Sequence, residues 1–129
     1  MDNVRGVIRN REFATQIRDF HGLRIGNITP TDVDAMIEYH GQCYVFIELK
    51  YGDAELPYGQ KIAFERLCDD LQKVKPTLFI VASHDGKGDI DVANSTVRKY
   101  RYEGKWITPQ GGNTWDLVNR FVTAIEKKQ

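Results

Sequence analysis

Two neighbouring segments of alternating apolar and polar residues constrain this fold more than any other feature of the chain. Residues 33–39 and residues 43–50 each alternate, and three residues, 40–42, separate them. Alternation with a period of two is typical of a β-strand with one buried face, and so short a connection joins two such strands as a hairpin. The sequence therefore predicts an antiparallel β-hairpin over 33–50.

The register of this hairpin decides which side chains share a face. A turn centred on Gly41 sets Asp34 opposite Glu48. The apolar face is then formed by Ala35, Ile37, Tyr39, Cys43, Val45, Ile47 and Leu49. The opposite face carries Asp34, Glu38, Glu48 and Lys50 with Met36 and Phe46. Because opposed Cβ atoms lie about 4.5–5.5 Å apart, the carboxylates of Asp34 and Glu48 could hold one cation between them.

The remaining elements follow from apolar spacing and from the position of proline. Helical spacing predicts helices over 11–21, 60–73 and 115–128. The apolar run 78–82 predicts a central strand that is covered on both faces. We further expect a loop over 83–94 and a hairpin formed by 97–102 and 105–107 around Glu103-Gly104. Because strands and helices interleave, the fold class is α/β or α+β, with a mixed central β-sheet flanked by helices.

Composition limits the kind of protein further. The 129 residues are 41% hydrophobic and 28% charged, which is typical of one globular domain over 1–129 that can bury a core without disulfides or a structural metal. The longest apolar run, 78–82, is too short to cross a bilayer. No apolar leader follows Met1, and Cys43 and Cys68 are not spaced as metal ligands. We therefore expect a cytoplasmic protein with reduced thiols and no membrane partner.

Charge is balanced overall but unevenly distributed. Lys and Arg number 18 and Asp and Glu number 18, yet residues 1–24 and 95–129 are both basic. Residues 25–60 carry six acidic side chains and a single basic one, Lys50. An acidic centre between basic arms suits a metal-dependent enzyme that acts on a polyanion. The alternative is chance patterning on a solvated surface.

The first hairpin also resembles a known motif. Asp34-Ala-Met-Ile, a turn, and Val-Phe-Ile-Glu48-Leu-Lys50 resemble the D…ExK core of the PD-(D/E)xK nuclease superfamily, which has the restriction-endonuclease-like fold. Residues 56–67 are similar to the segment that follows the catalytic lysine in virus-type replication-repair nucleases. Val33 stands where the family motif has proline.

This resemblance covers residues 10–82, as an αββαβ core. The hairpin and helix over 95–128 lie outside it. What the resemblance implies is therefore confined to the first two thirds of the chain.

The resemblance implies a Mg²⁺-dependent nuclease that hydrolyses phosphodiester bonds in DNA, with Mn²⁺ as a substitute metal. Asp34, Glu48 and the main-chain carbonyl of Leu49 would bind the metal. Lys50 would orient or help deprotonate the attacking water, and Gln60 would support the metal site or the substrate phosphate. Products of this family usually carry a 5′-phosphate. Simpler interpretations are a cross-strand ion pair for Glu48 and Lys50 and a helix-start role for Gln60.

Other residues are weaker candidates. Glu12 could match an acid found in the first helix of many family members, and Asp32 competes with Asp34 as the metal ligand. Asp32 could instead cap the strand entry or pair with Lys50. The candidate nucleic-acid-binding residues are Arg98, Lys99, Arg101 and Trp106. A solvated face with aromatic packing is the alternative interpretation of these four.

Three function classes remain open at this level. The first is the active nuclease, for which a homodimer is expected if both strands of a duplex are cut. The second is a catalytically inactive module of the nuclease fold that binds nucleic acid or a protein partner. The third is an unrelated α/β interaction domain whose acidic side chains form surface ion pairs.

Overall fold

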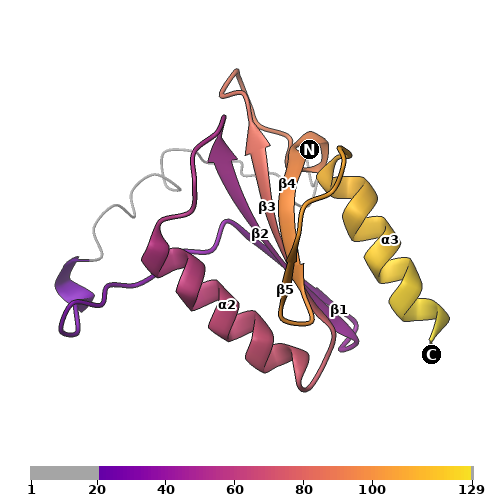
Figure 1. The fold of residues 1–129 in the computed structure, drawn as a ribbon, viewed down its shortest axis with the longest axis horizontal. Coiled ribbons are helices and arrows are strands. Elements are labelled where there is room, and N and C mark those ends of the chain that lie inside the picture. Colours follow the sequence, from indigo (N-terminus) through magenta and orange to yellow (C-terminus); the bar gives the residue numbers. More distant parts are fainter. Residues whose placement is uncertain (1–20, 129) are drawn as a thin grey trace, which may run out of the picture. The chain divides into compact units, whose positions relative to one another are not determined.

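The computed structural model describes residues 21–128 of the chain. Within them it has an α+β fold with five strands and two α-helices (Figure 1). The strands are β1 (Ala35–Tyr39), β2 (Cys43–Tyr51), β3 (Thr77–His84), β4 (Thr96–Tyr102) and β5 (Lys105–Ile107). The helices are α2 (Tyr58–Gln72) and α3 (Thr114–Lys127), with short 3-10 helices η1 (His21–Leu23) and η2 (Val92–Asn94).

The chain divides into two compact units at residue 32. The described part of the first unit, 21–32, contains η1 and a short bridge between Ile25 and Ile28. The Arg24 side chain donates to the Gly26 carbonyl at 2.7 Å and so closes this turn on itself. The predicted helix over 11–21 lies outside the described residues except for His21, which belongs to η1.

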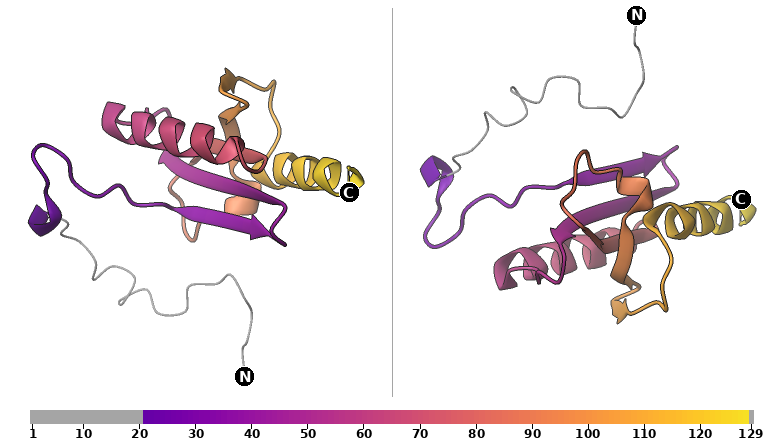
Figure 2. Two further views of the ribbon diagram at one scale, coloured as in Figure 1. Left: turned by 90° about the horizontal axis from the view of Figure 1, so that it is seen from below. Right: turned by 90° about the horizontal axis from the view of Figure 1, so that it is seen from above.

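The second unit, from residue 33 onward, holds the whole sheet. Its strands lie in the order β1-β2-β3-β4-β5, so β1 forms one edge in both views of Figure 2. The pair β2 and β3 is parallel, whereas the other neighbouring strands are antiparallel. The mixed sheet that the sequence predicts is therefore confirmed.

The first hairpin has the predicted register. Ala35 pairs with Ile47 and Ile37 pairs with Val45. The turn places His40 and Gly41 at positive φ, 50° and 70°, a conformation that glycine adopts without steric cost. The strand begins at Ala35 rather than at Val33 as predicted, so the paired ladder stops one residue short of Asp34.

The crossover from β2 to β3 is formed by α2. The helix begins directly after Pro57 and ends before Pro76. Proline suits the first of these positions because a helix leaves its first N–H groups unpaired in any case. The helix thus starts two residues earlier than the spacing of apolar residues indicates, since no apolar contact is needed for its first turn.

Each face of the sheet carries its own apolar cluster. On one face α3 packs on the strands, and the cluster consists of Val45, Ile47, Leu78, Ile80, Ala82, Val97, Leu117 and Val118. On the other face α2 packs on them, and the cluster consists of Phe46, Leu56, Phe64, Cys68, Phe79 and Val81. Full burial of one such side chain contributes about 1.5–3 kcal/mol. Successive residues of β2 and β3 belong alternately to one cluster and to the other. The prediction that 78–82 is covered on both faces is therefore confirmed.

The C-terminal third also follows its predicted pattern. Glu103 and Gly104 form the turn between β4 and β5, with φ of 52° and 77°. Asn113 caps α3 by accepting a hydrogen bond from the main-chain N–H of Asp116 at 2.8 Å. Strand β3 extends to His84, and η2 occupies the end of the predicted loop over 83–94. Neither α-helix in the described part of the chain has the length and apolar character of a membrane span.

A polar network joins β4 and β5 to α2. The Arg101 guanidinium donates two hydrogen bonds to the Asp69 carboxylate, at 2.9 and 2.7 Å. The Trp106 indole N–H donates to Glu65 at 2.6 Å, and Arg101 also lies 3.8 Å from Glu65. Because hydrogen bonds between charged groups are stronger than neutral ones, this network fixes α2 against the far half of the sheet.

The Asp69–Arg101 pair predicts a pH dependence of stability. The hydrogen bond from Arg101 holds the pKa of the Asp69 carboxyl below its usual value. A lowered pKa in the folded state adds stability above the unfolded pKa of about 3.9, and this stability is lost as pH falls through the folded value. We expect Asp69→Asn to lower the free energy of unfolding by about 1 kcal/mol at neutral pH, because the side chain is 37% exposed.

Urea denaturation of the two proteins between about pH 7 and pH 3 measures this difference. The difference in the free energy of unfolding should shrink as the pH falls toward the folded-state pKa of Asp69. Asp70→Asn is the matched control, because Asp70 is 75% exposed in its pair with Lys73 and should change stability little. An equal loss in both variants at every pH would contradict the prediction.

Candidate active site

Glu48 is the centre of the candidate site, and it is buried. It lies on β2 opposite Val81 of β3, with a side chain only 3% exposed. A carboxylate in such a position requires hydrogen bonds or opposite charge. Gln60 Nε2 of α2 donates to Glu48 Oε2 at 2.7 Å, and Lys50 Nζ lies 3.7 Å from the same oxygen. Three sequence-predicted residues therefore meet at the carboxyl end of the parallel strand pair.

The local folding explains why these three side chains converge. Glu48 and Lys50 stand two residues apart on β2, so they share the face that α2 covers. Gln60 lies in the first turn of α2, shortly after the loop that leaves β2. Because the strand end and the helix start are close in the chain, the site is assembled from one continuous segment.

Asp34 reaches β2 from the position that precedes β1. It is exposed and precedes β1, and its Oδ2 accepts a hydrogen bond from the main-chain N–H of Leu49 at 2.8 Å. The Asp34 side chain thus accepts from a main-chain N–H of β2 that a carbonyl of β1 would otherwise pair with. This explains why β1 begins later than predicted, while Asp34 still lies beside the Glu48–Leu49 peptide.

The donor atoms at this site are oxygens. Asp34 and Glu48 supply carboxylates, and oxygen donors are what Mg²⁺ prefers. Because Gln60 Nε2 faces Glu48, its Oε1 faces elsewhere, and this buried oxygen accepts no hydrogen bond from residues 21–128. Across those residues no three His, Cys, Asp or Glu side chains form a metal group. The donor chemistry fits Mg²⁺ with two carboxylates, provided that amide, main-chain or water oxygens complete the shell.

One of the weaker acidic candidates belongs to the first unit, and the other lies outside the described residues. Asp32 is exposed in the first unit, ahead of β1, and Glu12 lies outside the described residues. Asp34 is hydrogen-bonded to β2, and the choice between Asp32 and Asp34 as the metal ligand stays a prediction.

Arg98 holds the loop that connects the site strand to α2. Its guanidinium donates to the carbonyls of Ala54 and Asp53 and lies 3.1 Å from Glu55. This loop connects Lys50 to Gln60 along the chain, so Arg98 holds the segment between these two site residues. The sequence contains no signal for this role, because nothing around Arg98 on β4 indicates that it contacts residues 53–55 of a distant loop.

The other predicted nucleic-acid residues lie together but face α2. Lys99 Nζ lies 4.6 Å from the centre of the Trp106 ring, as a cation–π contact. Arg101 and Trp106 donate to the acids of α2 described above. These contacts favour the packing interpretation of this hairpin, and contact of Arg98, Lys99, Arg101 or Trp106 with nucleic acid stays a prediction.

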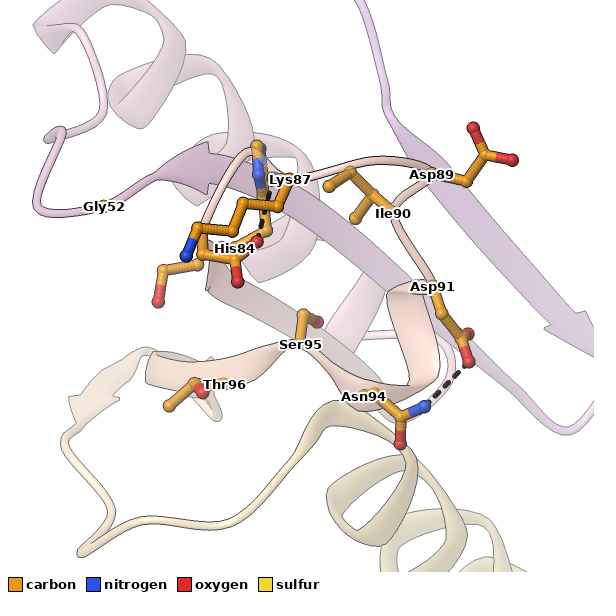
Figure 3. Close-up of a pocket in the computed structure, with 11 residues that line it drawn as sticks. Gly52, His84, Lys87, Asp89, Ile90, Asp91, Asn94, Ser95 and Thr96 are labelled. Carbon is orange, nitrogen blue, oxygen red and sulfur yellow. Dashed lines mark hydrogen bonds between the residues drawn. The ribbon is translucent and has the colours of Figure 1, made fainter.

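A pocket of about 460 Å³ opens at the ends of β2 and β3 (Figure 3). No motif in the sequence indicates a pocket here. Its lining residues are Gly52, Ser83, His84, Asp85, Lys87, Asp89, Ile90, Asp91, Asn94, Ser95 and Thr96. Ser83 and His84 are the strand partners of Lys50 and Tyr51. The pocket therefore adjoins the end of the strand that carries the candidate site.

The chain matches no protein-family model, no curated protein and no solved structure. The α+β architecture and the site described above rest on this protein's own residues.

The Gln60 contact predicts a measurable stabilisation. Gln60→Leu keeps the approximate size of the side chain but removes a donor to the buried Glu48 carboxylate. Weakening the hydrogen bonding of a buried charge costs about 1–3 kcal/mol. We expect a loss of that size in urea denaturation, and little loss for Gln110→Leu, since Gln110 is exposed in a loop. Equal effects in the two variants would show that the Gln60 contact contributes no specific stability.

Proposed function

We propose that this protein is a metal-dependent nuclease that hydrolyses phosphodiester bonds in DNA. The observation that carries the proposal is the buried Glu48 carboxylate, which lies within reach of Lys50 and Gln60 while Asp34 binds the adjacent Leu49 N–H. A purely structural acid seldom occupies a 3% exposed position. The resemblance to the PD-(D/E)xK motif supports the same assignment, because it names the same four side chains.

Asp34 and Glu48 would hold Mg²⁺ or Mn²⁺, with the Leu49 carbonyl and Gln60 Oε1 as candidate further donors. When bound, such an ion lowers the pKa of a coordinated water and offsets negative charge on the phosphate. Both carboxylates lie at the acidic centre of the chain, and Lys50 is the one basic side chain in residues 25–60. The site therefore combines cation binding with a single local positive charge.

The chain's own groups have distinct tasks in the hydrolysis. Lys50 places its ammonium beside the reacting phosphate and orients the attacking water. Water adds its oxygen to phosphorus, the bond from phosphorus to the 3′ oxygen breaks, and the leaving oxygen takes a proton. This leaves a 5′-phosphate and a 3′-hydroxyl. Gln60 holds Glu48 in one orientation through its 2.7 Å hydrogen bond, which fixes the geometry before substrate arrives.

The proposal includes nucleic acid as the partner and the cytoplasm as the compartment. A homodimer belongs to it only if both strands of a duplex are cut, because each chain carries one such site. If nucleic acid is bound but not cut, the inactive nuclease-fold module replaces the enzyme as the better assignment.

Cleavage of supercoiled, linear, single-stranded and branched DNA with Mg²⁺ or Mn²⁺ tests the activity. We expect Glu48→Gln and Lys50→Met to reduce the cleavage rate at least a hundredfold, because each removes a charge from the reacting region. The matched control is Glu38→Gln, which changes a carboxylate on the same face of the same hairpin. Its side chain keeps an oxygen for the Gly41 N–H and should leave the rate unchanged. A rate that survives Glu48→Gln would place the activity elsewhere.

Metal binding has its own readout in thermal unfolding. A ligand that binds only the folded state at about a hundred times its Kd raises the free energy of unfolding by about 2.7 kcal/mol. We expect millimolar Mn²⁺ to raise the Tm of the wild type but not that of Asp34→Asn. The asparagine oxygen can still accept from Leu49 N–H, so stability without metal should stay close to wild type. An equal rise in both proteins would exclude Asp34 as a ligand.

A further inference from the structure

We propose that Tyr51 and the pocket beside it receive an unpaired nucleobase, so that the substrate is single-stranded or locally unpaired nucleic acid. This inference rests on the proposed nuclease function and specifies its substrate class. It depends on three observations: the exposure of Tyr51, the way its ring is held, and the charge of the pocket.

Tyr51 is an exposed aromatic residue directly beside the candidate site. It is the last residue of β2 and follows Lys50, and it is 65% exposed. A single exposed aromatic side chain is common on protein surfaces, so the exposure of Tyr51 matters here because it leaves the ring accessible to a base. Base stacking on such rings is the usual way in which proteins hold single-stranded nucleic acid.

The Tyr51 ring is fixed although it is exposed. Its centre lies 5.9 Å from the centre of the His84 ring. It also lies so close to Gly86 that a Cβ built there would be 2.5 Å from Tyr51 Cε1. His84 Nδ1 in turn accepts from the Gly86 N–H at 3.0 Å. The ring is therefore preorganised, which lowers the entropy cost of binding a base.

The pocket shares a residue with the surroundings of this ring, although Tyr51 itself does not line it. His84 contacts Tyr51 and also lines the pocket, as does the adjacent Gly52 (Figure 3). A volume of about 460 Å³ lies within the range of small-ligand pockets. Figure 3 shows His84 and Lys87 on one side of it, and Asp91 and Asn94 on the other.

The charge of the pocket selects a base rather than a phosphate. Asp85, Asp89 and Asp91 line it against one cation, Lys87. Asp85 accepts from the Lys87 N–H at 2.9 Å, and Asp91 accepts from Ala93 and Asn94. A phosphate would be repelled by this excess of carboxylates, whereas the amino groups of a nucleobase can donate to them.

Only an unpaired base can use this arrangement. Inside a duplex both faces of a base are covered by its stacking neighbours, so a protein ring gains access only after the base is unstacked. Tyr51 and Lys50 are neighbours at the end of β2 but point to opposite faces of the sheet, so a single strand with a base on Tyr51 would reach Lys50 by passing around this strand end. Tyr51 thus acts as a specificity-determining residue, distinct from the groups that carry the reaction.

Binding without divalent metal separates this inference from cleavage. Fluorescence anisotropy with a labelled single-stranded DNA oligonucleotide in EDTA gives the Kd, and a duplex of the same sequence serves as the comparison. One stacked base contributes about 1–3 kcal/mol, so Tyr51→Ala should weaken single-strand binding about 5- to 150-fold. Tyr51→Phe keeps the ring and should stay within about twofold of wild type. Duplex binding should change little in either variant.

Two glycines of one loop provide a matched pair. Gly86→Ala forces the Tyr51 ring to move, whereas Gly88 has φ of 63° and no atom within 4 Å of an added Cβ. Both substitutions strain the backbone at positive φ, but Gly86→Ala alone displaces the ring. We expect single-strand binding to weaken in Gly86→Ala and to persist in Gly88→Ala.

The outcomes separate the two proposals. If the wild type binds and cuts DNA while Tyr51→Ala binds single strands equally well, the base subsite is excluded and the nuclease stands. An equal loss on single strand and duplex also overturns the subsite, since it would show a general effect on binding. A wild type that neither binds nor cuts any DNA overturns the nuclease proposal itself.

Discussion

The parallel pairing of β2 with β3 is the constraint on which the rest of the structure depends. A parallel pair needs a crossover, and that crossover is α2, which brings Gln60 back over the end of β2. Because both strands are covered on both faces, α3 must lie on the face opposite α2. The same burial leaves Glu48 almost without water, so its carboxylate depends on Lys50 and Gln60. One strand pairing thus fixes the core, the helices and the candidate site.

Polar contacts add to the apolar packing of α2 in holding the elements around the candidate site. Arg98 holds the loop between β2 and α2 by its carbonyls, and the Asp69–Arg101 pair holds the body of α2 against β4. A functional side chain must be held within about 0.5 Å of its productive geometry, and contacts of this kind supply that support. The basic residues of β4 therefore contribute to the candidate site by placing its elements, and this role is independent of whether they also touch nucleic acid.

The sequence-based predictions were correct where they rested on local periodicity and less accurate where they depended on contacts between separate elements. The hairpin register was predicted correctly because alternation has a period of two, so a shift of one residue would expose the face carrying Val45 and Ile47. The start of β1 was predicted two residues too early, because the Asp34 side chain rather than its backbone meets β2. Glu48, Lys50 and Gln60 were predicted as one group and do meet.

The sequence by itself determined the order of elements, the first register and the residues of the candidate site, because these depend on local periodicity and on short separations along the chain. Tertiary structure alone decided that Arg101 and Trp106 face α2, that Arg98 holds the site loop, and that Tyr51 meets His84 and Gly86 beside a pocket. Those contacts join residues that only the packing of sheet and helices brings together. That packing decides which distant residue a side chain contacts, and the neighbouring residues in the sequence do not indicate it.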